Sequence, residues 1–339
     1  MIQSLQKNIS FLAIISAGIA FLFALPLIYI ILRLFAEQAN LINLINSAEI
    51  FKPLIRTVIL GITVTGFSLL LGTSLAWLIA RTNIAMKSIL QILIPLPLAI
   101  PSFIIASTYI IAFRPSGKIY DLLAIFKLDN LIAFEGFIAV CISLILITYP
   151  YIYLPTLARL SMLSTNAEEN AKMLGQKDFS IFYKITWPQI SNAAFAGSVL
   201  TFLYVIGDFG VVQLLGYPNL ATSIYANRLA SPTTSFMLSL ILAIVAISIV
   251  LIEKKYFSKK NTFFDAPGGL SKIINLGKYK YLFAIIALIV ISFALFIPII
   301  ILINWVYKAS ISSEIGYTTL GSFSLISEFI LIIPKGPLT

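Results

Sequence analysis

The sequence has no histidine and a single cysteine, Cys141, which lies inside an apolar run. These absences exclude a disulfide within the chain and a zinc site made from cysteine and histidine ligands. We interpret Cys141 as a small buried hydrophobic residue. The apolar runs also carry no HExxH motif and no paired carboxylates, so nothing in them predicts an enzyme, a cofactor or a metal site.

Charged residues are scarce as well. Only 11% of the 339 residues are charged and 60% are hydrophobic, whereas a soluble domain carries roughly 25% charged residues. Apolar stretches of about 20 residues recur, and this is the length that crosses a hydrocarbon core by helix. The sequence therefore predicts an all-α integral membrane protein surrounded by membrane lipid. The net charge of +10 does not indicate nucleic acid binding, because Lys and Arg sit in short loops without interleaved aromatics.

Seven membrane-spanning helices are expected, each bounded by charge or by loops rich in Pro, Gly and Asn. The first apolar run, 11–35, is too long for the core of a cleavable signal peptide, so we interpret it as a retained helix. The expected spans are 10–35, 54–80, 89–113, 136–159, 191–215, 235–253 and 281–306.

The distribution of basic residues predicts the orientation of these spans. With a cytoplasmic N-terminus, 14 Lys and Arg residues fall in cytoplasmic loops and 9 fall on the opposite side. The loop 253–280 carries most of this bias. Because basic residues accumulate on the cytoplasmic side of a membrane, we expect the N-terminus to be cytoplasmic.

The seventh expected span echoes the first: Leu295–Ile300 reads LFIPII where Phe23–Ile28 reads FALPLI. Chance is an alternative, since apolar runs with one proline are common in membrane helices. The echo suggests that 1–253 is a first six-span unit, 254–280 a cytoplasmic linker with a Pro-Gly-Gly turn, and 281–339 the start of a second unit.

A polar segment, 161–190, separates the fourth and fifth expected spans and is patterned as two short helices. Asn166 can cap the first helix, with Glu169 as its capping-box partner, and Gly175 ends it. Asp178 can cap the second helix, and Pro188 closes the segment before the next span.

The second helix of this segment is also expected to have an apolar face. Helices this short are marginal in water, so the face needs the membrane surface or a partner protein to pack against. The residues expected to share the face are Phe179, Phe182, Tyr183 and Thr186.

The spacing of the segment resembles the EAA loop of ABC importer permeases, whose pattern is E-A-A-x3-G-x9-I-x-L-P. Here it runs ENA at 169–171, three residues, Gly175, nine residues, then ITWP at 185–188. Asn170 and Trp187 depart from the pattern, whereas the glutamate, the bend glycine and the closing proline are kept. The resemblance implies a six-helix ABC importer transmembrane domain plus one extra span. The residues it assigns to ATPase coupling are Glu169, Asn170, Ala171, Gly175, Ile185 and Pro188.

The resemblance covers roughly residues 10–310. The stretches 75–82, 95–101 and 207–225 are similar to ferric iron permeases, with thiamine, sulfate or polyamine as alternative substrates. In this family a periplasmic substrate-binding protein selects the substrate and a cytoplasmic ABC ATPase supplies energy through the EAA loop. The sequence has no GxxxxGK[ST] motif, so nucleotide is expected on that partner. The resemblance also implies a multi-pass protein of the bacterial inner membrane.

Three residues are candidates for the translocation pathway. Asp208 is ionisable, and such a residue costs at least ~2.5 kcal/mol at the membrane centre unless it faces a cavity or partner. Alternatively, it lies near the outer end of the fifth span and bonds to neighbouring backbone. Pro97 and Pro101 are expected to kink the third span and to free carbonyls that could line a pathway, with irregular packing as the alternative. A secondary transporter or channel would need more ionisable residues within the spans.

The tail after the seventh expected span departs from the repeat. Pro26 lies 27 residues before Pro53, and the same offset from Pro298 arrives at Leu325. The apolar run in 326–337 is shorter than the ~17 residues that a span requires. We therefore expect a shortened version of a two-half permease, which needs a second permease half from another chain or a homodimer.

Overall fold

The computed structural model describes residues 2–36, 48–114, 117, 134–163, 166–256 and 274–315, and these are almost entirely helical. Six of these described helices are long and apolar enough to cross a membrane, and the count rises to seven if one sharply bent pair of helices is taken as a single span. The helices are α1 (Ile2–Ala36), α3 (Ala48–Arg81), α4 (Lys87–Leu93), η1 (Leu96–Ala99), α5 (Ser102–Phe113), α7 (Gly136–Met162), α8 (Asn166–Met173), α9 (Asp178–Ile181), η3 (Phe182–Thr186), α10 (Trp187–Gly207), α11 (Gly210–Leu214), α12 (Leu220–Ala230), α13 (Pro232–Tyr256), α14 (Tyr279–Ile291), η4 (Ser292–Phe296) and α15 (Ile297–Ile315).

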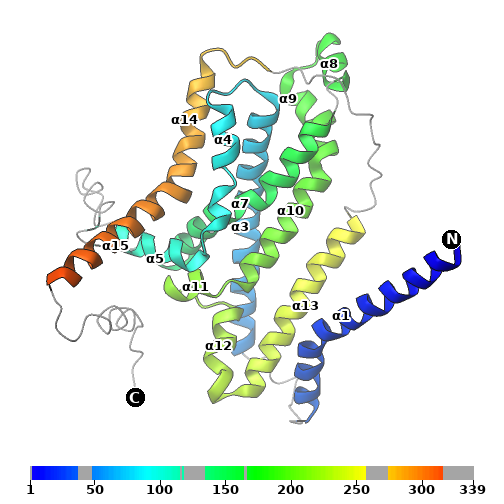
Figure 1. Cartoon of the computed structure of the whole chain (residues 1–339), viewed down its shortest axis with the longest axis vertical. Helices are drawn as coiled ribbons and strands as arrows, with labels where there is room; N and C mark the ends of the chain where they lie inside the picture. The colour runs from blue at the N-terminus through cyan, green and yellow to red at the C-terminus, as the bar shows by residue number, and fades with distance from the viewer. Residues whose placement is uncertain are drawn as a thin grey trace.

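The centre of the molecule is a bundle of α3, α7 and α10, which pack against one another along much of their length (Figure 1). Glycines allow the close approach. A Cβ on Gly72 of α3 would lie 2.7 Å from the carbonyl oxygen of Tyr149, and one on Gly197 of α10 would lie 2.5 Å from that of Tyr151. Small residues at such contacts are what lets membrane helices associate, because there the attraction comes from close packing.

The expected third span, 89–113, is wrong as a continuous helix. It is broken into α4, η1 and α5, and its two parts meet at 96°. Ile100 is extended because it precedes Pro101, which begins α5. The break leaves the carbonyl of Ile94 outside the helical ladder, where it accepts a hydrogen bond of 2.8 Å from the buried hydroxyl of Tyr149. The kink expected from Pro97 and Pro101 is therefore confirmed, and it is a full break.

The fifth span also differs from its expected range, 191–215. The helix is continuous from 178 to 207 and ends at Asp208, so Pro188 does not close the loop segment. It lies in the first turn of α10, directly after the π-helical turn η3, in which Trp187 donates to the carbonyl of Phe182. The wider turn lets the helix continue past a residue that cannot donate a hydrogen bond.

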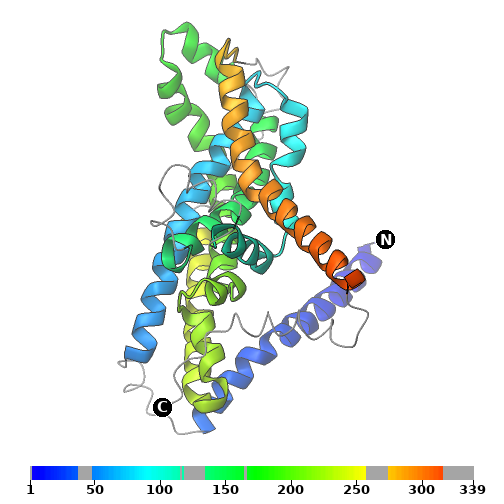
Figure 2. The same cartoon turned by 90° about the vertical axis from the view of Figure 1, so that its left-hand side faces the viewer.

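The seventh span repeats this device: the π-helical turn η4 ends two residues before Pro298. The turn η4 lies beside η1, while α14 packs on α4 and α15 packs on α5. The helices α14 and α15 therefore run alongside the two parts of the broken third span (Figure 2). By contrast, α1 packs mainly on α13, and its N-terminal part extends away from the central bundle (Figure 1).

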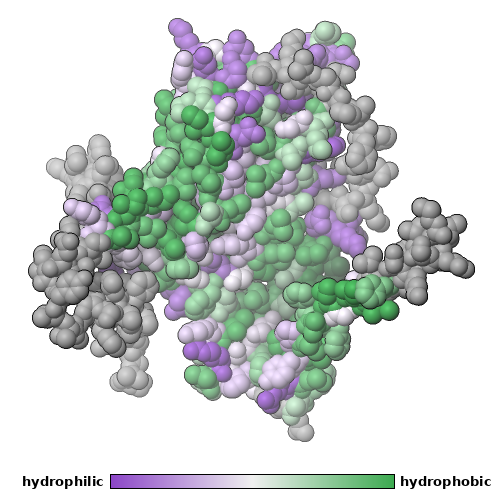
Figure 3. All heavy atoms as spheres, viewed as in Figure 1, coloured by the Kyte–Doolittle hydropathy of each residue, from purple (hydrophilic) through white to green (hydrophobic). Residues whose placement is uncertain are grey.

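The polarity of the surface follows the helices. Hydrophobic side chains gather over α14, α15 and α5, whereas hydrophilic ones gather at the end of the molecule that carries α8 and the start of α14 (Figure 3). At the opposite end lies α12, a helix that the expected spans did not include. It is begun by a capping box in which the side chain of Asn219 accepts from the backbone of Thr222 and the Thr222 hydroxyl accepts from the backbone of Asn219.

Candidate functional site

The segment 161–190 lies at one end of the molecule, beyond the last turn of α3 and beside the residues before α14, of which Ile274 forms an isolated β-bridge with Thr82 (Figure 1). Its described part consists of α8, a turn, and α9 leading into η3. The two predicted short helices are confirmed, although the second continues into the fifth span. Lys177 precedes that helix as its N-cap residue and Asp178 is its first residue, so the predicted cap is displaced by one position. The side chain of Asn166 lies outside the described residues.

Gly175 sets the bend between α8 and α9. Its φ is +77°, in the left-handed region that glycine tolerates best. Its N–H donates 3.0 Å to the carbonyl of Lys172, and the N–H of Gln176 donates 3.1 Å to that of Ala171, which is the pattern of a Schellman turn. Nothing in the described part of the chain lies within 4 Å of a Cβ built on Gly175, so backbone geometry alone requires glycine. The predicted bend is confirmed.

The carboxylate of Glu168 joins the loop to two other elements. Its Oε1 lies 3.3 Å from a terminal guanidinium nitrogen of Arg81, the last residue of α3, and accepts a 2.9 Å hydrogen bond from the hydroxyl of Thr186 in η3. The Arg81 side chain is 2% exposed and that of Glu168 19%. The sequence reasoning missed both residues, because the adjacent Glu169 matches the family pattern.

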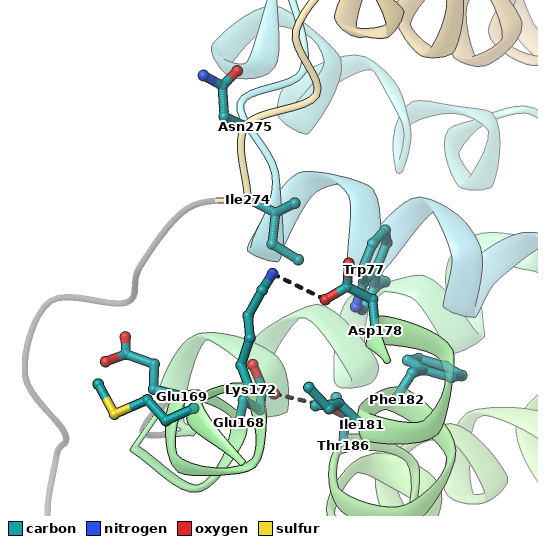
Figure 4. Close-up of a pocket in the computed structure, with 11 residues that line it drawn as sticks. Trp77, Glu168, Glu169, Lys172, Asp178, Ile181, Phe182, Thr186, Ile274 and Asn275 are labelled. Atoms are coloured by element: carbon teal, nitrogen blue, oxygen red, sulfur yellow. Dashed lines mark hydrogen bonds and ion pairs between the residues drawn. The ribbon is translucent and has the colours of Figure 1, made fainter. Parts of the chain in front are cut away.

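The residues that the resemblance assigned to coupling occupy different environments. Ala171 is buried, Glu169 and Ile185 are half-buried, and Asn170 and Pro188 are exposed. Figure 4 shows Glu168 turned toward Thr186, whereas Glu169 points away from it on the same helix. The structure therefore brings the EAA positions together on one loop and directs their side chains to opposite sides.

The apolar face predicted for the second helix is wrong, because its four residues divide between two sides. Phe182 packs edge-on against Trp77 of α3, and Thr186 is buried. Phe179 and Tyr183 are exposed on the other side.

Exposed apolar side chains gather at the bend. We call this surface the apolar tip; it consists of Met173, Leu174, Phe179 and Tyr183. An ion pair of 3.0 Å between Lys172 and Asp178 crosses the bend beside it, and both of these side chains are largely exposed, at 61% and 68%.

A groove of about 530 Å³ lies between the loop, the end of α3 and the residues before α14. Acidic and aromatic side chains line it together (Figure 4). Its lining includes Trp77, Glu168, Glu169, Asp178, Phe182 and Asn275. Within the part of the chain that the structure describes, no group of three His, Cys, Asp or Glu residues is placed to hold a metal ion.

Asp208 lies in a second polar cluster, at the end of α10. It is buried and accepts a 2.9 Å hydrogen bond from the N–H of Val211 in α11, a short helix that packs on α5. Asp208 thus bonds to neighbouring backbone, as one of its two interpretations expected, and it holds the start of the helix that lies between the fifth span and the broken third span. Pro101 lies beside this junction in sequence, whereas Pro97 is buried within η1.

Comparison with known proteins identifies the family. Residues 68–253 match the family described as the binding-protein-dependent transport system inner membrane component. This match covers more than half of the chain. The chain therefore belongs to this family of inner-membrane ABC transporter permeases, as the EAA spacing indicated.

Individual relatives carry different substrates in their names. The Fe(3+)-transport system permease protein FbpB 2 of Haemophilus influenzae is 29% identical over 320 residues, covering 90% of this chain and 56% of that protein. The sulfate permease CysW of Escherichia coli K12 is 24% identical, covering 58% and 67%. The molybdenum permease ModB of Mycobacterium tuberculosis is 27% identical, covering 69% and 89%. The chain thus spans just over half the length of FbpB 2.

Solved structures with a similar fold include a bacterial alginate ABC transporter in complex with a pentasaccharide-bound periplasmic protein. That likeness has a TM-score of 0.60 at 18% identity and covers 77% of this chain and 98% of that one. A second structure of an alginate importer has a TM-score of 0.52 at 20% identity, covering 65% and 82%. At these identities the likeness shows the fold, which is the all-α transmembrane domain of an ABC importer.

Proposed function

We propose that this chain is the membrane-spanning permease subunit of an ABC importer and that the segment 161–190 couples it to a cytoplasmic ABC ATPase. The observation that carries the proposal is the apolar tip. Four large apolar side chains stand exposed on a bend at the polar end of the molecule, beside helices that run into the spans. A protein partner that buries them would gain about 1.5–3 kcal/mol for each side chain fully covered.

The two sides of the loop have different roles in coupling: one binds the ATPase and the other attaches the loop to the spans. The apolar tip faces outward and docks on the ATPase, with Glu169 and Asn170 as its polar neighbours. Ala171 and Ile185 face inward and hold the loop against the spans, while Gly175 fixes the angle between the two short helices. Since α9, η3 and α10 form one continuous helix, displacement of the tip passes directly into the fifth span past Pro188.

The translocation pathway runs along the junction between the broken third span and the fifth. Pro97 and Pro101 create the break, and Asp208 at the end of α10 bonds to the start of α11, which packs on the second part of the broken span, α5. Broken helices at membrane depth are found where they line a cavity or are buried in protein. Rocking of the fifth span against this junction would open it to one side of the membrane and then the other.

The importer needs a second unit of this fold, either a second permease half or a second copy of this chain, because paired ATPases engage two coupling loops. We assign 1–253 to the first unit, 254–280 to a cytoplasmic linker and 281–339 to the second unit. The N-terminus is cytoplasmic, on the same side as the loop. The packing of the seventh span on α4 and α5 supports a close association of the two units.

The substrate is delivered by a periplasmic substrate-binding protein, and ferric iron is our choice. The support is the resemblance of 207–225 to ferric iron permeases and the 29% identity to FbpB 2 across 90% of the chain. Sulfate and molybdate are the competing substrates, because relatives named for them also match.

Uptake by proteoliposomes tests the proposal. The chain would be reconstituted with the ABC ATPase and the periplasmic binding protein encoded beside it, and ferric iron, sulfate and molybdate would be offered separately. We expect uptake of ferric iron that depends on ATP and on the binding protein. Uptake of sulfate or molybdate in its place would correct the substrate alone, whereas ATP-independent uptake driven by an ion gradient would refute the importer.

A further inference from the structure

Arg81 carries a guanidinium group that is buried and only partly satisfied. Its one described ion pair is the 3.3 Å contact with Glu168, and its Nε has no hydrogen-bond partner among the described residues. Arg81 ends α3, where a cation interacts favourably with the helix dipole. A buried ion pair adds little net stability compared with an apolar contact, but removing one partner leaves a costly buried charge. The pair is therefore better suited to fixing a geometry than to stabilising the fold.

The backbone of the same residue holds a different part of the chain. The N–H of Ile274 donates 2.8 Å to the carbonyl of Arg81, and the N–H of Asn83 donates 3.2 Å back to the carbonyl of Ile274. The Asn83 side chain bonds to the Asn275 side chain at 2.9 Å and accepts from the N–H of Leu276 at 2.8 Å. Residues 81–83, at the end of α3, are thus hydrogen-bonded to the residues that lead into α14.

We propose that Arg81 is a positioning residue that makes the coupling loop, α3 and the entry to α14 move as one body. Its guanidinium holds Glu168, and through that carboxylate also Thr186 of η3. Its carbonyl holds Ile274. A displacement of the loop therefore moves the second, fifth and seventh spans together. We call these contacts of Arg81 with Glu168 and Ile274 the joint. An exposed, hydrated ion pair would not make this joint rigid, because solvent and salt screen it.

The ion pair between Lys172 and Asp178 provides a matched control, because it lies in the same loop but is largely exposed. An exposed pair of this kind contributes little. Glu168→Gln keeps the size of the side chain and an oxygen that can accept from Thr186, and it removes the charge that Arg81 meets. Asp178→Asn makes the equivalent change in the exposed pair.

This inference rests on the proposed function, so the first measurement is substrate taken up per ATP hydrolysed in the complete reconstituted complex. For Glu168→Gln we expect this ratio to fall about tenfold while hydrolysis continues; for Asp178→Asn, whose carboxylate lines the same groove but belongs to an exposed pair, we expect a clearly smaller fall. If Glu168→Gln assembles poorly, Arg81→Lys gives the same comparison, because it keeps the charge and loses the planar fork. An unchanged ratio in Glu168→Gln would overturn the proposed role of Arg81, including the case in which uptake and hydrolysis both fall in equal proportion.

A second measurement does not depend on transport and separates failure of the joint from failure of the proposed function. Spin labels would be placed at Met173→Cys on the loop and Ser74→Cys on α3, both exposed, in a Cys141→Ser background. We expect one narrow distance distribution in the parent chain and in Asp178→Asn, and a clearly broadened one in Glu168→Gln. An unchanged distribution in Glu168→Gln would overturn the joint, whatever the uptake assay shows.

Discussion

The hydroxyl of Tyr109 donates a hydrogen bond of 2.6 Å to the backbone carbonyl of Phe293, and so ties α5 to the π-helical turn η4. The two residues are 184 positions apart. A π-helical turn disturbs the regular ladder of helix hydrogen bonds, and here a buried tyrosine from the broken third span bonds to one of its carbonyls. The bond holds the second part of the broken third span against the π-helical turn of the seventh span.

Removing this hydroxyl should loosen the contact between α5 and the seventh span. We expect Tyr109→Phe to destabilise the detergent-solubilised protein by about 1 kcal/mol, since hydrogen bonds between membrane helices are worth roughly that amount. A lowered midpoint of thermal unfolding would show the effect. Tyr307→Phe, at an exposed position on α15, serves as the control and should leave the midpoint unchanged; an equal loss in both variants would count against the bond.

Substitutions of Gly175 should act through the backbone alone. Because its φ is positive and the space around it is open, Gly175→Ala should cost about 1 kcal/mol of local stability, and Gly175→Asn should cost less because asparagine tolerates this conformation. Amide hydrogen exchange across α8 and α9 measures this local opening. If alanine and asparagine both exchanged like the parent chain, the bend would not require glycine.

Two substitutions of Asp208 distinguish a structural role of its hydrogen bond from a role of its negative charge. Asp208→Asn keeps an oxygen for the N–H of Val211, so we expect it to retain stability and most uptake. Asp208→Ala leaves a buried N–H without its acceptor and should cost about 1–3 kcal/mol. Unfolding midpoints and uptake would be compared for both variants. A stable Asp208→Asn protein without uptake would show that the charge itself is required in the pathway.

The positions of the first, second, fourth, sixth and seventh spans could be predicted from the sequence, because uninterrupted apolar length is a local property, whereas the third is broken and the fifth begins earlier than expected. The break at Pro101 could be predicted only as a kink, since a full break needs a partner for the freed carbonyl of Ile94, and that partner is the distant Tyr149 hydroxyl, which donates to it. Likewise, no sequence pattern distinguishes Glu168 from Glu169 as the inward carboxylate. That choice depends on how α8 is rotated, and a buried arginine 87 positions away determines the rotation.

Pro188 and Pro298 show a related limit. Each was expected to interrupt a helix or to mark a repeat, but each follows a π-helical turn that lets the helix continue. Whether a proline ends a helix depends on whether the preceding turn can widen within its packing environment. The predictions for the tail, at Leu325 and 326–337, lie outside the described residues.

The apolar tip should bind the ATPase through a few side chains. We expect Leu174→Ala to weaken binding of the purified ATPase by at least 1 kcal/mol, about fivefold in Kd, as for a central residue of an interface. Leu229→Ala is the control, because Leu229 is equally exposed, at 83%, and lies on α12 at the opposite end. Titration calorimetry with both variants would decide between docking by the tip and a general loss of apolar surface.

The central claim is that the bend of the 161–190 loop is a cytoplasmic docking surface for an ATPase, and sided cysteine labelling tests it most directly. A single cysteine would be placed at Met173→Cys, or at Leu229→Cys for comparison, in the Cys141→Ser chain. Membrane vesicles of both orientations would be treated with an impermeant maleimide, with and without the ATPase. We predict that position 173 is labelled only from the cytoplasmic side and is protected by the ATPase, whereas position 229 is labelled only from the other side without protection. Labelling of position 173 from the periplasmic side, or cytoplasmic labelling that the ATPase does not reduce, would contradict the account.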